Sequence, residues 1–306
     1  MSRTAARPRL RWRRVGAAVA GAALFASFGV LGPAAAVDDV DGGAEVTDSA
    51  QRRGPAPDQE RALLISDSAW LSIYLYGTFD AVQGFDHSLA LASCRRRVAT
   101  SCTNFDGFVP ITLLEELRAH DASYTTLIVA TGYNDSDGRF ANEVAQIITT
   151  ARSQGIQRVV WVTLRDNGTY VSPGNRGFAE SFQRANATLR AIDAAGTYPE
   201  LVLADWGQYS EAQTQWFSAD GIHLRTRGSY AASDYVSRKM AFLLGEPCPQ
   251  PIAAGQPVAD PCVDPDVHGP IVDLDSLYPA NTTNRQPFLL AWEGSSSWPN
   301  APWWER

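Results

Sequence analysis

Three side chains that can act together in nucleophilic catalysis stand at distant points of the sequence: Ser68, Asp220 and His223. A serine hydroxyl is a weak nucleophile without a base, and His223 is the best-placed histidine because Asp220 precedes it by three residues in "DGIHL". In one tight turn the Asp220 carboxylate can accept from one ring nitrogen, which leaves the other nitrogen for Ser68. The alternatives are a solvated loop or a metal half-site, but nothing near this pair in the sequence supplies a second histidine as a metal ligand.

Two further features can stabilise the negative charge that develops when a carbonyl is attacked. Ser68 follows the apolar run "ALLIS", where a strand is expected to turn into a helix. Its backbone amide and the positive end of the helix would then point at the same place. Asn134 follows the run "TTLIVAT", and its NH2 group can donate to an oxyanion without the cost of burying a charge.

The elements that must position these residues are five short apolar runs, each typical of a buried strand. Helical patterns follow some of them, and this alternation predicts a parallel sheet with helices on both faces, in one three-layer α/β/α domain. In such sheets ligands bind outside the carboxyl ends of the strands, which is where the polar residues above are found. The expected strands are 62–66, 87–93, 125–131, 158–164 and 201–206, and the expected helices are 139–155, 176–196 and 227–245.

The composition and the N-terminus restrict the class of protein. The chain has 306 residues, is 45% hydrophobic and 19% charged, and carries a net charge of −7, so it can bury a sizeable core and is a poor match for nucleic acid. Its first 36 residues have a basic head, an apolar middle and a small-residue exit at 34–36, the pattern of a secretory signal peptide cleaved near Ala36. We expect export, with an uncleaved membrane anchor as the alternative.

The rest of the chain divides into three parts by composition. Residues 37–58 are polar and rich in glycine and proline, and we interpret them as a disordered linker. The predicted domain covers 59–246. Residues 247–306 form a Pro- and Trp-rich extension. The stretch 246–270, where the chain enters this extension, is expected to form neither a regular helix nor a central strand. The terminal tryptophans are expected to clamp this tail onto the domain, with sugar stacking as the alternative.

Four cysteines in an exported chain indicate disulfide bonds, and four allow three pairings. Short loops favour Cys94 with Cys102 and Cys248 with Cys262, while free buried thiols are the alternative. Neither pair has the spacing of a zinc site.

The three polar blocks, taken in order, resemble those of the SGNH (GDSL-type) hydrolases. The blocks are "ISDSAW" around Ser68, "GYND" from Gly132 to Asp135, and "DGIHL"; the segments "CRRR…SC" and "VVWVTLR" are similar to a secreted bacterial branch of that family. The resemblance covers residues 62–245 and implies a flavodoxin-like sheet of five parallel strands. It also implies that Ser68 is the nucleophile, His223 the base and Asp220 its orienting partner. The oxyanion hole would comprise the Ser68 amide, Asn134 and a glycine of the second block.

The sequence departs from the family pattern at two positions. Ser66 stands where the first block has a glycine, which would be disfavoured by roughly 1 kcal/mol if that position requires φ > 0. The second block has no glycine, because the run "HSLALAS" leads directly into "CRRR". A backbone N–H near Cys94–Arg96 is expected to serve instead.

Other residues near the blocks are expected to bind substrate or support loops. Asp67 and Asp135 are predicted to brace their turns, Gly132 belongs to the third block, Tyr133 is placed in the pocket lining, and Arg95 is the arginine best placed to bind substrate. For Arg96 and Arg97 an exposed charged loop is an equally good interpretation.

Together these features predict a secreted serine esterase with no metal and no organic cofactor, acting on O-acyl, above all O-acetyl, esters of carbohydrate or cell-envelope polysaccharide. Its partner would be an acylated small molecule or polysaccharide, with no nucleic acid, no membrane contact except through an uncleaved signal segment, and a monomeric state. The alternatives are an O-acyltransferase that uses the same triad and a non-catalytic envelope-binding protein on the same fold.

Overall fold

The structure is a computed structural model that describes residues 39–40, 43–48, 60–104, 107–120, 123–167, 176–253 and 255–270. The expected signal peptide and the tryptophan-rich end beyond residue 270 lie outside these ranges. Within them, no helix is both long enough and apolar enough to cross a membrane.

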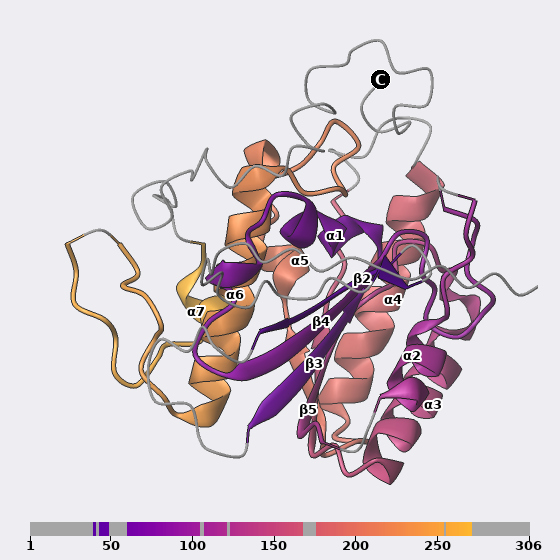
Figure 1. Cartoon of the computed structure of the whole chain (residues 1–306), viewed down its shortest axis with the longest axis horizontal. Helices are drawn as coiled ribbons and strands as arrows, with labels where there is room; N and C mark the ends of the chain where they lie inside the picture. Colours follow the sequence, from indigo (N-terminus) through magenta and orange to yellow (C-terminus); the bar gives the residue numbers. More distant parts are fainter. Residues whose placement is uncertain are drawn as a thin grey trace, which may run out of the picture. The chain divides into compact units, whose positions relative to one another are not determined.

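A central sheet with strand order β1-β2-β4-β3-β5-β6-β7 organises the described chain (Figure 1). The five strands from β4 to β7 in this order are all parallel, which confirms the predicted fold class and each of the five predicted strands. Their order places the first expected strand between the second and the third, as in flavodoxin-like sheets. The parallel strands are β3 (Arg61–Ser66), β4 (Asp86–Ala92), β5 (Thr126–Ala130), β6 (Arg158–Val162) and β7 (Leu201–Ala204).

The segment expected to be a disordered linker contributes an edge to this sheet. Strand β2 (Gly43–Asp48) pairs antiparallel with β4, and β1 (Asp39–Val40) pairs antiparallel with β2. The expectation for residues 37–58 was therefore wrong for these eight residues. An edge strand is held by backbone hydrogen bonds along one side, and the absence of apolar periodicity does not exclude it.

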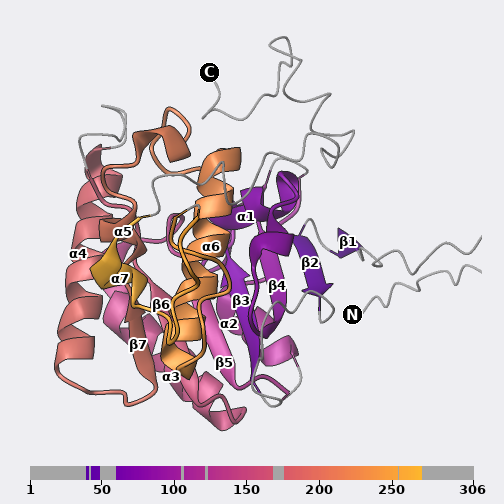
Figure 2. The same cartoon turned by 90° about the vertical axis from the view of Figure 1, so that its left-hand side faces the viewer.

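Helices cover both faces of the sheet, as Figures 1 and 2 show. The three predicted helices are present, and α6 ends at Gly245 in the left-handed conformation that favours glycine. The helix expected to follow "ALLIS" is present as α1, and the predictions omitted α2, which begins with a Thr112–Glu115 capping box. The α-helices are α1 (Ser68–Leu75), α2 (Leu113–Ala119), α3 (Phe140–Ser153), α4 (Arg176–Ala194), α5 (Trp206–Tyr209), α6 (Thr226–Leu244) and α7 (Pro265–His268), with short 3-10 turns at Phe79–Ala81, Asp137–Arg139 and Thr214–Trp216.

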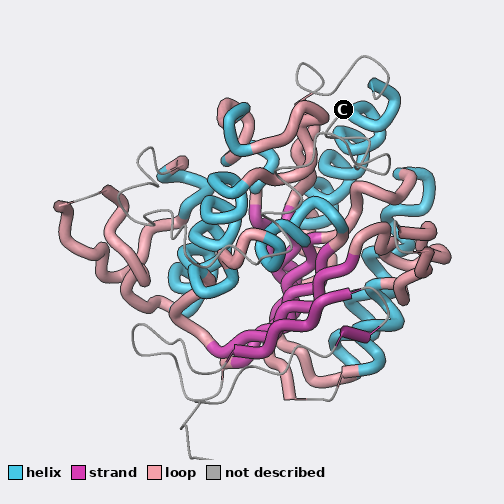
Figure 3. The backbone as a smooth tube through the Cα atoms, turned by 45° about the horizontal axis from the view of Figure 1, so that its top comes forward, coloured by secondary structure: helices cyan, strands magenta, loops and turns pink. Residues whose placement is uncertain are grey.

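Each strand contributes alternate residues to two separate cores, because successive side chains of a strand point to opposite faces. Leu64 and Ile128 pack under α1 and α6, whereas Leu63 and Leu127 pack under α2 and α3 on the other face. The strands stand between these two layers in Figure 3. Burial on both faces is the reason that the strands are continuous apolar runs.

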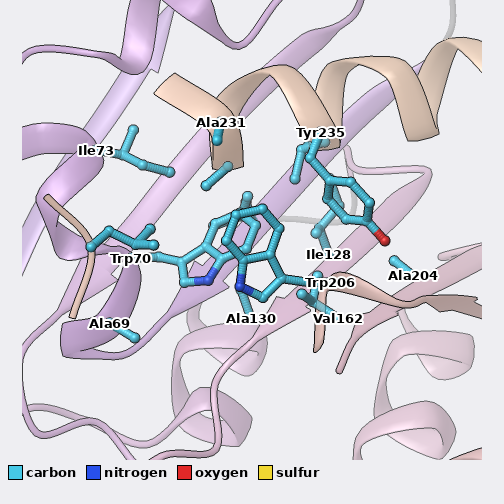
Figure 4. Close-up of a cluster of buried hydrophobic side chains, with 14 of the residues drawn as sticks. Ala69, Trp70, Ile73, Ile128, Ala130, Val162, Ala204, Trp206, Ala231 and Tyr235 are labelled. Atoms are coloured by element: carbon cyan, nitrogen blue, oxygen red, sulfur yellow. The ribbon is translucent and has the colours of Figure 1, made fainter. Parts of the chain in front are cut away.

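A cluster of buried aromatic side chains supports the first helix directly beneath the candidate nucleophile. Trp70, two residues after Ser68, packs edge-on against Trp206, and Trp206 packs against Tyr235 of α6 (Figure 4). All three side chains are buried. Deep anchoring of Trp70 fixes the first turn of α1, and with it the position of Ser68.

The first part of the C-terminal extension is attached to the last long helix. Asp266 accepts hydrogen bonds from Tyr235 and Lys239 of α6, and a disulfide joins Cys248 to Cys262. The expectation that 246–270 forms no regular helix was wrong for the single turn α7, where Pro265 occupies the first turn. Proline is tolerated there because the N–H at that position has no partner within the helix.

Candidate active site

Ser68 is the first residue of α1 and lies just beyond the carboxyl end of β3. The residue before it, Asp67, caps the helix by accepting a hydrogen bond from the Ala69 N–H at 3.0 Å. The first N–H groups of a helix have no partner inside it, so the helix end that carries Ser68 presents donors to the site.

Asp67 also joins this helix to the neighbouring strand end. Its second carboxylate oxygen accepts from the N–H groups of Gly132 and Tyr133, both at 2.8 Å, which follow β5. The side chain is fully buried, and burial raises the pKa of Asp67, an effect that its backbone hydrogen bonds and His223 oppose. Asp67 therefore braces the turn before α1, as the sequence predicts, and holds the "ISDSAW" block in a fixed position relative to the "GYND" block.

The structure brings Ser68 into contact with the Asp220–His223 pair, across 155 residues of sequence. The His223 Nδ1 atom lies 2.6 Å from an Asp220 carboxylate oxygen, and Nε2 lies 3.0 Å from the Ser68 hydroxyl. The other Asp220 oxygen accepts from the N–H groups of Ile222 and His223, so the carboxylate is held by its own loop. With Nδ1 donating to Asp220, Nε2 is the acceptor that faces the Ser68 proton.

Arg165, at the carboxyl end of β6, holds the loop that carries Asp220 and His223. Its guanidinium group donates to the Gly221 carbonyl at 2.8 Å and lies 4.2 Å from the centre of the Phe217 ring. The side chain is buried. From the sequence we identified Arg165 only as the end of "VVWVTLR"; its place after a buried strand is the signal that could have indicated this role.

Asn134 lies beyond the end of β5 and contacts the loop that follows β4. Its side-chain NH2 donates to the Arg95 backbone carbonyl at 3.3 Å, and its backbone carbonyl accepts from Arg96 Nε at 2.9 Å. One of its two amide N–H donors is thereby used. The contact joins the strand ends on either side of β3 around the end that carries Ser68.

The structure describes the backbone at both departures from the family pattern. Ser66 is an ordinary strand residue that pairs with Leu91 and Ala130, and it is not among the described residues with positive φ. A glycine is therefore not required there by a left-handed conformation. Cys94, in contrast, has a φ of 67° and is bonded to Cys102.

The remaining residues of the third block support its loop. A Cβ atom on Gly132 would lie 2.7 Å from the Arg97 guanidinium, so only glycine fits without a shift. Tyr133 is buried, and its hydroxyl accepts from the Arg165 N–H at 2.7 Å, so it braces the loop from within the core. Asp135 accepts from the Arg97 N–H, and burial raises its pKa to about 6 against the lowering effect of Arg97.

Two of the three arginines after Cys94 are structural. Arg95 is buried and donates to the carbonyls of Ala90 and Ile111, and it pairs with Glu116. These bonds support the loop. The interpretation of Arg97 as part of an exposed charged loop was wrong, because its side chain is 1% exposed and pairs with Glu143 at 2.8 Å.

A groove opens beside Asn134. It is lined by the exposed Phe178 and by charged side chains of both signs: Arg96, Arg139, Arg184, Asp135, Asp137 and Glu143. Ser68 and His223 are not among its lining residues. Within the described ranges, no cluster of three or more His, Cys, Asp or Glu side chains is arranged to hold a metal ion.

Comparisons with known proteins place solved GDSL-type hydrolases among the structures similar to this chain. A GDSL-like lipase from Bacteroides thetaiotaomicron has 12% sequence identity and a TM-score of 0.42, over 61% of this chain and 90% of that one. A member of the lipolytic G-D-S-L family from Veillonella parvula has 15% identity and a TM-score of 0.36, over 58% of this chain and 96% of that one. No family model and no curated protein matches the chain.

Proposed function

We propose that this protein is a secreted serine esterase of the SGNH type that hydrolyses O-acyl esters, with Ser68, His223 and Asp220 as its catalytic triad. The observation that carries the proposal is the chain of contacts from Asp220 through His223 to Ser68, with distances of 2.6 and 3.0 Å, at the carboxyl edge of a parallel sheet. Both distances are within the reach needed for proton transfer.

In the proposed reaction the Ser68 hydroxyl attacks the acyl carbonyl while His223 Nε2 takes its proton. Asp220 fixes the ring and stabilises the imidazolium that forms. The tetrahedral intermediate collapses when His223 gives the proton to the departing alcohol, which leaves an acyl group on Ser68. Water, activated by the same histidine, then releases the acid and restores the hydroxyl.

The negative oxygen of the intermediate would rest on donors that the fold holds in advance. The Ser68 N–H is at the positive end of α1, and Asn134 retains one amide N–H beyond the one it gives to Arg95. Donors that need no reorganisation during the reaction typically contribute about 10²- to 10³-fold in kcat each.

Acylated carbohydrate is the substrate class that these features favour. The groove beside Asn134 is lined by charged side chains of both signs, three arginines and three carboxylates, and by Phe178, which is 55% exposed. Aromatic faces and charged side chains suit a sugar better than they suit a long acyl chain. The basic and apolar N-terminus and the two disulfides support an exported protein that meets envelope polysaccharide.

The test is hydrolysis of p-nitrophenyl acetate together with labelling by a fluorophosphonate probe. Ser68→Ala and His223→Ala should each lower kcat by about 10⁴-fold or more, and Ser68→Ala should abolish labelling. The exposed Ser153 and His268 provide matched controls, since Ser153→Ala and His268→Ala should behave as wild type. A wild-type protein that is neither active nor labelled would exclude the esterase and favour a binding protein on the same fold.

A further inference from the structure

Cys94 has an unusual backbone conformation at the edge of the sheet that carries the candidate triad. Of the residues other than glycine that the structure describes, it is the single one with positive φ, at 67°. It follows the last residue of β4, Ala92, by two positions, and its side chain is bonded to Cys102. A side chain makes the left-handed conformation about 5- to 30-fold less populated, so the surrounding structure must hold it.

The strand register brings the chain segment that contains this residue next to the segment that leads to Ser68. Ser66, the last residue of β3, pairs with Leu91 of β4 on one side and with Ala130 of β5 on the other. The chain beyond β4 therefore runs alongside the chain that leads to Ser68. From the opposite side, Asn134 reaches the same loop through its hydrogen bond to the Arg95 carbonyl.

Two consecutive backbone donors in this loop have no acceptor among the described residues. The N–H groups of Arg96 and Arg97 are used, by the Ser101 hydroxyl and the Asp135 carboxylate respectively. Those of Cys94 and Arg95 make no hydrogen bond within the described part of the chain. Successive N–H groups around a left-handed residue can converge on one negatively charged atom.

The loop is fixed at both of these residues. The disulfide to Cys102 closes an eight-residue separation, and the Cys102 N–H donates to the Cys94 carbonyl at 3.2 Å. The Arg95 side chain is buried, with a 2.7 Å hydrogen bond to the Ala90 carbonyl of β4. The two donors are thus held by anchors that do not depend on a ligand.

We propose that the Cys94–Cys102 disulfide is part of the active-site machinery: it holds Cys94 in the left-handed conformation so that the N–H groups of Cys94 and Arg95 serve as further donors to the oxyanion. This inference rests on the proposed esterase function. Cys94 acts here through its backbone, and its bond to Cys102 is the positioning element. A glycine, which adopts this conformation freely, should be able to do the same without the disulfide.

The test compares two variants that both lack this disulfide. Cys94→Ala/Cys102→Ser retains a side chain at position 94, and Cys94→Gly/Cys102→Ser removes it. For p-nitrophenyl acetate we expect the alanine variant to lose about 10- to 100-fold in kcat with little change in KM, because the donors act in the transition state. The glycine variant should recover at least about tenfold of that loss.

Cys248→Ser/Cys262→Ser is the matched control, since it removes a disulfide from the C-terminal extension. It should lower thermal stability and leave kcat per fluorophosphonate-labelled site unchanged. Equal kcat values in the alanine and glycine variants would overturn the inference, because a disulfide that only stabilises the fold gives glycine no advantage in rate. Circular dichroism verifies that each variant is folded, and active-site labelling gives the concentration of active sites by which every kcat is normalised. Inactivity of the oxidised wild type would instead overturn the esterase function itself.

Discussion

Replacement of Asp67 by alanine tests the claim that one buried carboxylate holds the site together. In the structure this side chain accepts three backbone hydrogen bonds, from Ala69 at 3.0 Å and from Gly132 and Tyr133 at 2.8 Å. It therefore connects the helix that begins at Ser68 with the loop that leads to Asn134. Alanine removes every acceptor and leaves three N–H groups without one.

The expected loss follows from these three groups. A buried N–H left without an acceptor costs about 1–3 kcal/mol, and removal of a buried carboxylate relieves part of its own desolvation. Burial raises the pKa of Asp67, which shows that the buried carboxylate carries a desolvation cost that alanine removes. We therefore expect the free energy of unfolding to fall by about 3–5 kcal/mol, near the lower end of the sum for three N–H groups. Such a loss is a large share of the stability of a typical domain.

Asparagine at the same position is the matched control. Its one oxygen can still accept from Gly132 and Tyr133, while its NH2 group faces the Ala69 N–H and the helix cap is lost. The cost of a lost cap is about 0.5–2 kcal/mol, so Asp67→Asn should be clearly milder than Asp67→Ala.

Urea unfolding at neutral pH measures both free energies, and ester hydrolysis under folding conditions measures kcat. We expect the order wild type, asparagine, alanine in both quantities, because the loop that carries Asn134 loses its fixed position relative to Ser68. An alanine variant within 1 kcal/mol of wild type, with an unchanged kcat, would show that the three hydrogen bonds do not position the site.

Two further predictions concern the residues behind the site. Arg165→Met should lower kcat by about tenfold, because the Gly221 carbonyl loses its donor. Arg165→Lys should have an intermediate kcat, because a lysine cannot make the same planar contacts. An unchanged kcat in the methionine variant would contradict this role. For Asp135 the pKa in the folded state, about 6, exceeds the reference value of 3.8, so its stabilising contribution is complete below pH 4 and is lost as the pH rises through 6. Urea unfolding from pH 4 to 7 should show wild type losing up to about 3 kcal/mol relative to Asp135→Asn, and parallel curves would refute the shifted pKa.

The parallel strands of the sheet could be predicted because each one is recognisable from its own short stretch of sequence. Strands buried on both faces must be apolar throughout, so β3 to β7 stand out as short hydrophobic runs. The strand Gly43–Asp48 was missed because backbone pairing near the edge of a sheet requires no such pattern. The start of helix α1 after "ALLIS" was expected, but its extent was not, since most of the stability of such a short helix comes from packing such as that of Trp70 against Trp206.

The sequence by itself determined the types of the site residues and the strand ends that carry them. It also paired Asp220 with His223, because three residues separate them and one turn is enough to bring them into contact. Only the tertiary structure decided that Ser68 meets His223, across 155 residues, since that contact depends on strand register and on the packing beneath α1. The support from Arg165 and the left-handed backbone of Cys94 were also decided there, because neither a long-range hydrogen bond nor a φ angle leaves a periodic trace in the chain.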